Sequence, residues 1–208
     1  MDLSGPEISE LALPDVFLIS ALAVEDEAGV RYEAFRQDQV EEAVGRPFAI
    51  HYSELSVARR RVLRGVHGSA GPDSCARLFG CVRGAAVHAV VDLRVGSPDF
   101  GRHDTVWLDH HNVAGVFVPE GFGHAWLALQ DDTVLACHSS RPYAAASAYT
   151  VSALDPELAL PWGLTEAPVM TDADLAAPTV QEALAKGLLP AYEDCLALYG
   201  RPPLATSS

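Results

Sequence analysis

Between about residue 15 and residue 150, short apolar runs alternate with turn-forming segments. The stretch GAAVHAVVDLRVGSPDFG (84–101) gives a valine-rich strand and then a Gly-Ser-Pro-Asp turn, and the following residues continue with further strands and turns. Apolar residues alternate only in part, at Val106 and Leu108 and again at Val116 and Val118, which is typical of strands with one face buried and the other half covered. Turn signals recur roughly every 8–12 residues, a spacing that indicates a β-sandwich or a β-barrel.

Beyond about residue 155 the pattern changes to short helices bounded by proline and glycine. In APTVQEALAKG (177–187) a proline stands near the first helical turn and a glycine at the stop, and PAYEDCLALYG (190–200) repeats this punctuation. We therefore expect one domain over residues 1–200, with an antiparallel all-β core and a short helical C-terminal tail at about 155–200. The last residues, RPPLATSS (201–208), are expected to be disordered.

Composition and charge restrict the partners of this chain. Its 208 residues are 49% hydrophobic and 20% charged, as in folded globular proteins. The chain has no run of about 18 apolar residues, so we expect no membrane span, and the acidic start MDLSGPEISELALPD lacks the features of a signal peptide. We accordingly predict a cytoplasmic protein. The formal charge of −14 opposes binding to nucleic acid. The arginine cluster ARRRVLRG (58–65) could form a local basic pocket for an anionic ligand, but we interpret it as a solvated strand with charges at its edge.

The candidate metal ligands do not have the spacing of a metal site. No histidine stands two positions from His67, and His103 is far from the adjacent pair His110 and His111, whose rings would point to opposite sides of a strand. The cysteines form no Cys-x-x-Cys pair and are expected to be reduced in the cytoplasm: they are Cys75, Cys81, Cys137 and Cys195. We therefore predict that the protein binds no metal.

Two histidines have surroundings in which they could carry chemistry. His67 in LRGVHGSAGP (63–72) and His124 in VPEGFGHAWLAL (118–129) both lie where a glycine-containing segment meets an apolar strand. Together they could line one cavity at the mouth of a β-barrel, a common place for a small-molecule site. A neutral imidazole there can accept a proton near pH 7, and a carboxylate behind it would fix its tautomer. Each histidine could equally be a hydrogen-bonded core residue, and the residues alone leave both interpretations open.

Five motifs, in order along the chain, carry a resemblance to a known family: RGVH (64–67), VHAVVDLRVGSPDFGR (87–102), VFVPEGFGHAW (116–126), LDPELALPW (154–162) and MTDADLAAPT (170–179). Over residues 15–198 the chain resembles the dTDP-4-dehydrorhamnose 3,5-epimerases and the related dTDP-4-keto-6-deoxyhexose 3- or 5-epimerases of antibiotic-sugar pathways. This resemblance implies a double-stranded β-helix (a cupin-like jelly roll), a homodimer that exchanges N-terminal strands, and no metal or organic cofactor. It also implies removal of a proton beside a ketone and reprotonation of the resulting enolate from the opposite face.

Carried over by position, the resemblance assigns roles to individual residues. His67 matches the family's catalytic base, and Asp174 matches the aspartate that orients this base. Arg77 replaces the lysine that stabilises the enolate oxygen, and it keeps the positive charge in a larger, planar group. Other family positions that line the sugar or nucleotide site are Arg64, His124 and Tyr143.

The proton donor of the family is a tyrosine, and here its position holds Cys137, with His138 beside it. A thiol, with a reference pKa of about 8.5, is more acidic than a phenol at about 10, but it is shorter by most of a ring. Cys137 is therefore a candidate donor only if the substrate comes closer than usual. Its alternative interpretation is a small buried core residue.

The nucleotide-binding positions also depart from the family. Its signature Asp-x-Arg-Gly-x-Phe-x-Glu corresponds here to DEAGVRYE, in which Ala28 and Arg31 replace the arginine and the phenylalanine while Glu33 remains. Glu54 stands where the family has an asparagine. A lost charged contact of this kind costs roughly 1.5–3 kcal/mol, although Arg31 or Arg59 could compensate for it.

Three hypotheses follow from these observations. The main one is a metal-independent acid–base enzyme of this family, repurposed to epimerise, isomerise or cyclise a small carbonyl compound without a nucleotide in secondary metabolism. The alternative is a conventional dTDP-4-keto-6-deoxyhexose 3- or 3,5-epimerase, which titration with dTDP would distinguish from the first. A non-catalytic binding protein on the same fold is a further alternative, and a contact between Asp174 and His67 would count against it.

Overall fold

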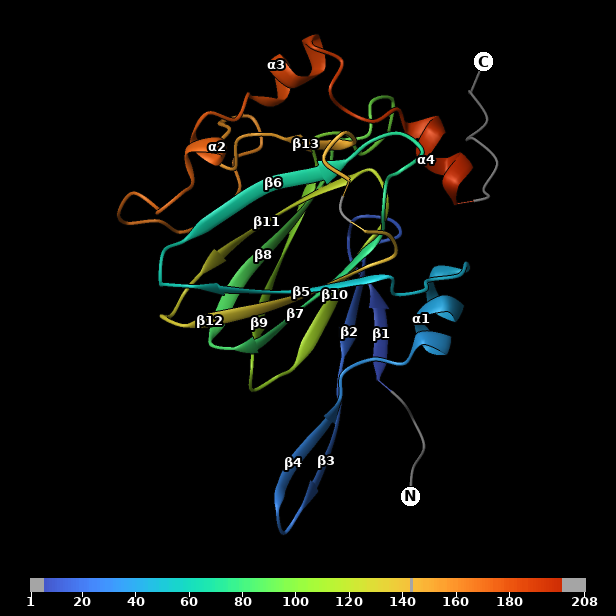
Figure 1. The fold of residues 1–208 in the computed structure, drawn as a ribbon, viewed down its shortest axis with the longest axis vertical. Helices are drawn as coiled ribbons and strands as arrows, with labels where there is room; N and C mark the ends of the chain where they lie inside the picture. The colour runs from blue at the N-terminus through green and yellow to red at the C-terminus, as the bar shows by residue number, and fades with distance from the viewer. Residues whose placement is uncertain (1–5, 143, 200–208) are drawn as a thin grey trace.

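Two antiparallel β-sheets packed face to face form the body of the molecule (Figure 1). The structure is a computed structural model that describes residues 6–142 and 144–199. The six-stranded sheet has the order β1 (Glu7–Glu10), β2 (Phe17–Ser20), β10 (Ala114–Val118), β7 (Arg77–Arg83), β12 (Thr133–Ser139) and β5 (Tyr52–Ala58). The five-stranded sheet has the order β13 (Ala148–Thr150), β6 (Leu63–Ser69), β11 (Phe122–Ala128), β8 (Ala85–Asp92) and β9 (His103–Asp109).

From β5 to β13 the chain changes sheet at every connection except the one between β8 and β9. This alternation confirms the predicted all-β double-stranded β-helix. The space between the sheets holds an apolar core, and the alternating positions predicted from the sequence point into it: Leu108, Val116 and Val118 are buried. Phe79 of β7 and Phe122 and Trp126 of β11 complete its aromatic part.

The C-terminal tail covers the outer face of the five-stranded sheet. Three short helices occur in it, α2 (Asp172–Leu175), α3 (Val180–Ala185) and α4 (Tyr192–Leu198), and Figure 1 shows them along one side of the body. The helix expected in residues 177–187 is α3, which begins with a reciprocal capping box between Thr179 and Glu182. The helix expected in residues 190–200 is α4. The predicted helical tail is thus confirmed, whereas residues 201–208 lie outside the described residues and the domain boundaries stay predictions.

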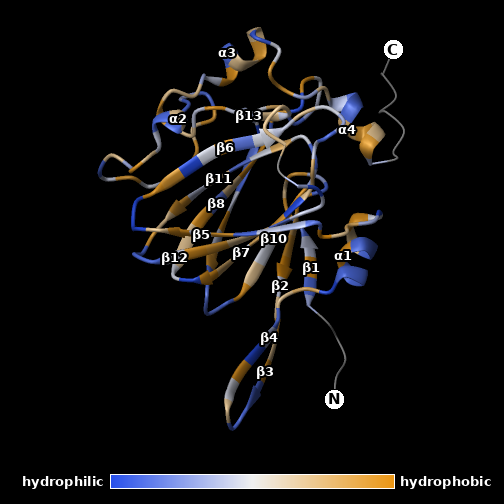
Figure 2. Cartoon of the chain, viewed as in Figure 1, coloured by the Kyte–Doolittle hydropathy of each residue, from blue (hydrophilic) through white to orange (hydrophobic). Residues whose placement is uncertain are grey.

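Two local predictions were wrong. Residues 37–44 form a helix, α1 (Gln37–Val44), which packs Val40 and Val44 against Phe117 on the outer face of the six-stranded sheet. Figure 2 shows both apolar and polar residues along α1, as expected for a helix that lies on a surface. The arginine cluster is also not a continuous strand, because Arg59 and the two arginines after it form the turn between β5 and β6.

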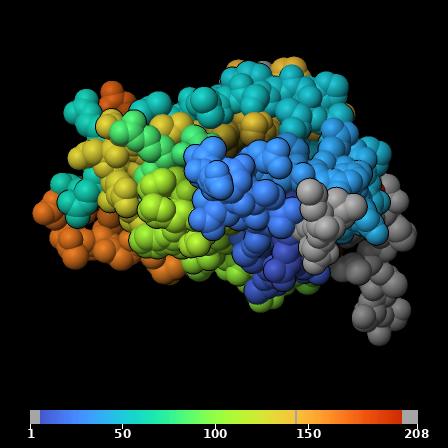
Figure 3. All heavy atoms as spheres, turned by 90° about the horizontal axis from the view of Figure 1, so that it is seen from below, coloured from blue at the N-terminus to red at the C-terminus, as the bar shows by residue number. Residues whose placement is uncertain are grey.

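The hairpin of β3 (Leu22–Asp26) and β4 (Gly29–Glu33) extends away from both sheets (Figure 1). Every residue of β4 is exposed, and in the view of Figure 3 the blue hairpin stands in front of the body. No helix in the described part of the chain is long and apolar enough to cross a membrane.

Candidate active site

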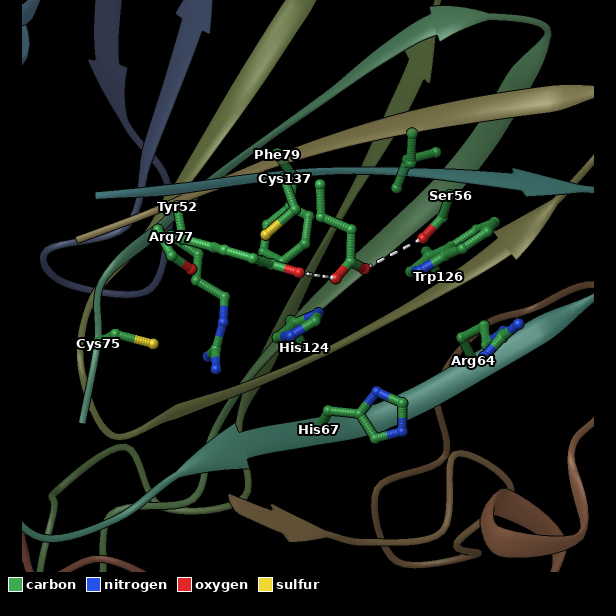
Figure 4. Close-up of a pocket in the computed structure, with 13 residues that line it drawn as sticks. Tyr52, Ser56, Arg64, His67, Cys75, Arg77, Phe79, His124, Trp126 and Cys137 are labelled. Carbon is green, nitrogen blue, oxygen red and sulfur yellow. Dashed lines mark hydrogen bonds between the residues drawn. The ribbon is translucent and has the colours of Figure 1, made fainter. Parts of the chain in front are cut away.

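A cavity of about 210 Å³ opens between the two sheets (Figure 4). Strands of both sheets contribute to its wall, so residues from distant parts of the sequence meet there. Its lining residues are Tyr52, Glu54, Ser56, Arg64, His67, Cys75, Arg77, Phe79, His124, Trp126, Leu135, Cys137 and Ser139.

A histidine and an aspartate form a hydrogen-bonded dyad at this cavity. Nε2 of His67 lies 2.7 Å from Oδ1 of Asp174. The aspartate is only 2% exposed, whereas the imidazole is 38% exposed. An ionised carboxylate can only accept hydrogen bonds, so in the neutral form of this imidazole Nε2 carries the proton and Nδ1 has the free lone pair. The dyad can therefore accept a proton at Nδ1, and the buried carboxylate stabilises the imidazolium that results.

The start of helix α2 holds the aspartate in place. Thr171 is the N-cap of α2, and its hydroxyl accepts a hydrogen bond from the backbone N–H of Asp174 at 3.1 Å. The same hydroxyl donates to Oδ2 of Asp174 at 2.7 Å, and the backbone N–H of Gly65 lies 3.4 Å from Oδ1. Each carboxylate oxygen thus accepts at least one hydrogen bond, and the orientation of Asp174 does not depend on His67 alone.

An irregularity in β6 brings Arg64 and His67 to the same cavity. Residues three positions apart point to opposite faces of a regular strand. The pairing between β6 and β11 shifts register between His124 and Trp126, so His67 pairs with His124 while Arg64 pairs with Trp126. Gly65 lies within this irregularity at φ +106°, and a Cβ atom there would lie 2.6 Å from the carbonyl oxygen of His124. Only glycine allows the two strands to approach so closely at this point.

His124 forms the floor of the cavity between His67 and the core. Its ring centroid lies 6.1 Å from that of His67 and 4.3 Å from that of Phe79. Burial, together with the positive charge of Arg77, holds the pKa of His124 well below its usual value. Behind it lies His88, whose complete burial lowers its pKa to about 3. Both rings are therefore neutral at physiological pH, and sequence reasoning did not single out His88.

Two arginines supply positive charge to the cavity. Arg77 lies at the start of β7 and points to the same side as Phe79, two residues along the strand. Arg64 enters from β6. Neither guanidinium forms an ion pair with a carboxylate in residues 6–142 or 144–199. Both groups are thus available to an anionic ligand or to a developing negative charge.

The opposite wall, formed by β5 and β12, carries hydroxyl, carboxyl and thiol groups. The hydroxyl of Tyr52 donates to Glu54 at 3.0 Å, and the hydroxyl of Ser56 donates to the other oxygen of Glu54 at 3.4 Å. Cys137 lies on β12 directly opposite Glu54 in the strand register. Burial raises the pKa of its thiol to about 12, so the thiol is protonated.

Not every predicted site residue reaches the cavity. His67, Asp174, Arg77, Arg64, His124, Glu54 and Cys137 lie in it or contact it. Glu33 lies on the exposed hairpin and Arg59 in the turn after β5, and neither lines the cavity of its own chain. Tyr143 lies outside the described residues. Tyr52 was missed, although its alternation with Glu54 and Ser56 in the sequence places it on the same face of β5.

The fold and this site define a cupin-like protein equipped for acid–base chemistry at a small-molecule pocket. The family model described as dTDP-4-dehydrorhamnose 3,5-epimerase matches residues 10–182. The chain belongs to this family of epimerases.

Individual relatives agree with this assignment. The chain is 38% identical over 188 residues to a dTDP-4-dehydrorhamnose 3,5-epimerase of Mycolicibacterium smegmatis, covering 90% of this chain and 92% of that protein. It is also 38% identical over 168 residues to a dTDP-4-dehydro-6-deoxyglucose 3-epimerase of Streptomyces bikiniensis, covering 81% and 86%. The crystal structure of NovW, a 4-keto-6-deoxy sugar epimerase from the novobiocin gene cluster of Streptomyces spheroides, superimposes with a TM-score of 0.89 at 37% identity, covering 92% of this chain and 96% of NovW.

Proposed function

We propose that this protein epimerises a dTDP-4-keto-6-deoxyhexose at a carbon beside the ketone. The hydrogen bond of 2.7 Å between His67 and Asp174 is the observation that carries this proposal, since it prepares a base of the required kind. The names of the relatives favour the conventional epimerase over a non-nucleotide substrate. They also weaken the hypothesis of a non-catalytic binding protein.

In the proposed reaction, Nδ1 of His67 removes the proton from the carbon beside the ketone. The electrons of the broken C–H bond form the enolate double bond, and the carbonyl oxygen takes the negative charge. Asp174 stabilises the imidazolium by accepting the hydrogen bond from Nε2–H. This assigns His67 as the catalytic base and Asp174 as the residue that positions it.

The enolate oxygen requires positive charge or a hydrogen-bond donor nearby. Arg77 supplies the charge from β7, and the neutral imidazole of His124 beside it can donate one hydrogen bond. Arg64 is assigned to the diphosphate or the sugar, because its guanidinium has no carboxylate partner among the residues that the structure describes. Two such cations also support an anionic substrate over a neutral carbonyl compound.

Glu33 can contribute to this site only from a second copy of the chain. The hairpin that carries it is exposed and extends from the body. In the expected homodimer with exchanged N-terminal strands, it would lie over the cavity of the partner. Arg59 directly follows β5, does not line the cavity and is not carried by the exposed hairpin. Its assignment to the substrate therefore stays a prediction.

Calorimetric titration with dTDP, followed by assay with dTDP-4-dehydro-6-deoxyglucose, tests the proposed function. We expect micromolar dTDP binding and formation of an epimer at the carbon beside the ketone. Absence of binding at millimolar dTDP, together with no turnover, would instead favour the hypothesis of a non-nucleotide substrate. Titration with thymidine as a control shows how much of the affinity comes from the diphosphate.

A further inference from the structure

Inversion at a carbon needs a proton donor on the side of the substrate away from His67. This requirement follows from the proposed function, and the inference below depends on it. His67 projects from β6 of the five-stranded sheet, so the donor must come from the facing six-stranded sheet, of which β5, β7 and β12 line the cavity (Figure 4). In the described part of that wall, two side chains lining the cavity carry a weakly acidic proton: the thiol of Cys137 and the phenol of Tyr52.

The thiol of Cys137 is poorly suited to this task. It projects only one atom beyond Cβ, and the side chain is half buried against the core between the sheets. Burial raises the pKa of the thiol to about 12. A substrate at normal contact distance from His67 would therefore have to move deeper into the cavity, toward the core, before its carbon could contact the thiol of Cys137.

Tyr52 lies one strand further along the same wall and is long enough to reach over Cys137. In the register of β5 and β12, Cys137 is paired with Glu54, and Tyr52 with Ser139. The phenol donates to Glu54 at 3.0 Å, so its side chain runs along β5 toward the residue that faces Cys137. Figure 4 shows its hydroxyl on the side of the cavity opposite His67, above the ring of His124.

Glu54 holds this phenol in place and keeps it protonated. Its two oxygens accept hydrogen bonds from Tyr52 and Ser56, and all three side chains lie on one face of β5. The hydrogen bond and the negative charge of Glu54 raise the pKa of Tyr52. Since the carbon of an enolate is a far stronger base than a phenolate, this shift does not prevent proton transfer to carbon.

We propose that Tyr52 is the proton donor of the epimerisation and that Glu54 is its positioning residue. As the ketone re-forms, the electron pair of the enolate double bond takes the proton from the hydroxyl of Tyr52, which becomes a phenolate. The new C–H bond lies on the face opposite the one that His67 deprotonated. Tyr52 is 38% exposed, so solvent returns a proton to the phenolate, and His67 releases its own proton to solvent.

The test compares inversion with solvent exchange in the full-length protein. Wild-type enzyme in D₂O should invert dTDP-4-dehydro-6-deoxyglucose and place one deuteron at the inverted carbon, as measured by NMR. In Tyr52→Phe, we expect inversion to fall by at least about 100-fold. Deuterium should still enter the substrate without inversion, because His67 can return a deuteron to the same face. Tyr192→Phe on α4 removes a phenol that does not line the cavity and should keep both rates.

Glu54 and Cys137 variants complete the test. Glu54→Gln keeps an acceptor for the phenol and should keep the ratio of inversion to exchange, whereas Glu54→Leu should lower this ratio. If Glu54 had only a structural role, Glu54→Leu would lower the rates of inversion and of solvent exchange together. Inversion by Tyr52→Phe at the wild-type rate, or its loss in Cys137→Ala alone, would overturn the assignment of Tyr52. A wild-type enzyme that neither exchanges nor inverts would overturn the proposed function, and the role of Tyr52 with it.

Discussion

His67 and Asp174 are separated by 107 positions in the sequence, yet Nε2 of the histidine lies 2.7 Å from Oδ1 of the aspartate. The contact joins strand β6 to the first turn of helix α2. The helical tail therefore contributes to the site directly as well as covering the sheet. The predictions below follow from this arrangement and from the packing around it.

Replacing the buried carboxylate of the dyad should remove the charge that stabilises the imidazolium. Asp174→Asn keeps the shape and an oxygen for the hydrogen bond from His67, but it is neutral. We expect kcat and solvent exchange to fall together by at least about 100-fold. The matched control is Asp172→Asn, an exposed position of the same helix. Exchange at the wild-type rate in Asp174→Asn would show that the dyad is structural.

Arg77 should matter through its charge at the enolate oxygen. Arg77→Met should reduce solvent exchange by about 100- to 1000-fold, as for loss of a single group that stabilises an oxyanion. Arg77→Lys should retain most of the activity because it keeps the charge. Arg83→Met, an exposed position at the other end of β7, should have no effect. Equal activity of Arg77→Met and wild type would exclude Arg77 from the reaction.

Gly68 should not tolerate a methyl group. A Cβ atom at this position would lie 2.1 Å from Cζ of the Tyr149 ring, which is buried and donates a hydrogen bond to the carbonyl of Gly121. We expect Gly68→Ala to lower the free energy of unfolding in urea by about 1–3 kcal/mol. Gly80→Ala is the control, because its Cβ atom would have an ordinary contact of 3.5 Å. If Gly68→Ala were as stable as wild type, the Tyr149 ring would have to shift away from the new methyl group without a cost in folding free energy.

His88 should make the protein less stable in mild acid. It is buried and neutral, with a pKa lowered to about 3 by desolvation, against about 6.5 in the unfolded chain. Between these values the unfolded state binds one more proton at this residue, so stability falls as the pH falls. His88 alone should cost about 1.6 kcal/mol between pH 6.5 and pH 5, and His124 adds a loss of the same sign.

The measurement is the free energy of unfolding of wild type and His88→Leu at both pH values. The variant should lose the part of the acid sensitivity that His88 contributes and keep the loss of the same sign that His124 contributes. The contrary result is an unchanged pH dependence, which would mean that His88 is protonated at little cost or is solvated in the folded protein.

Local signals in the sequence predicted the parts of the fold that depend on short-range chemistry. Helices α3 and α4 were found because proline and glycine mark their ends. Helix α1 was missed, since its eight residues lie between strands and its apolar side consists of little more than Val40 and Val44. Its stability comes from packing on Phe117, a contact with no local signal.

The residues of the site also form two groups, those that sequence motifs predicted and those that only the three-dimensional structure places in the cavity. His67, Asp174 and Arg77 were assigned through the resemblance of their motifs, but spacing alone would have separated Arg64 from His67. The irregularity at Gly65 that reunites them depends on the approach of β11. Tyr52 was missed because its role depends on how β5 lies beside β12, which only the three-dimensional register gives.

The most direct test of the account is solvent exchange by His67→Asn. Wild-type protein incubated in D₂O with dTDP-4-dehydro-6-deoxyglucose should incorporate deuterium at the carbon beside the ketone. The account predicts that His67→Asn, which keeps a polar side chain but has no base at Nδ1, binds dTDP normally and exchanges at least about 100-fold more slowly. Exchange by this variant at the wild-type rate would contradict the assignment of His67 as the base.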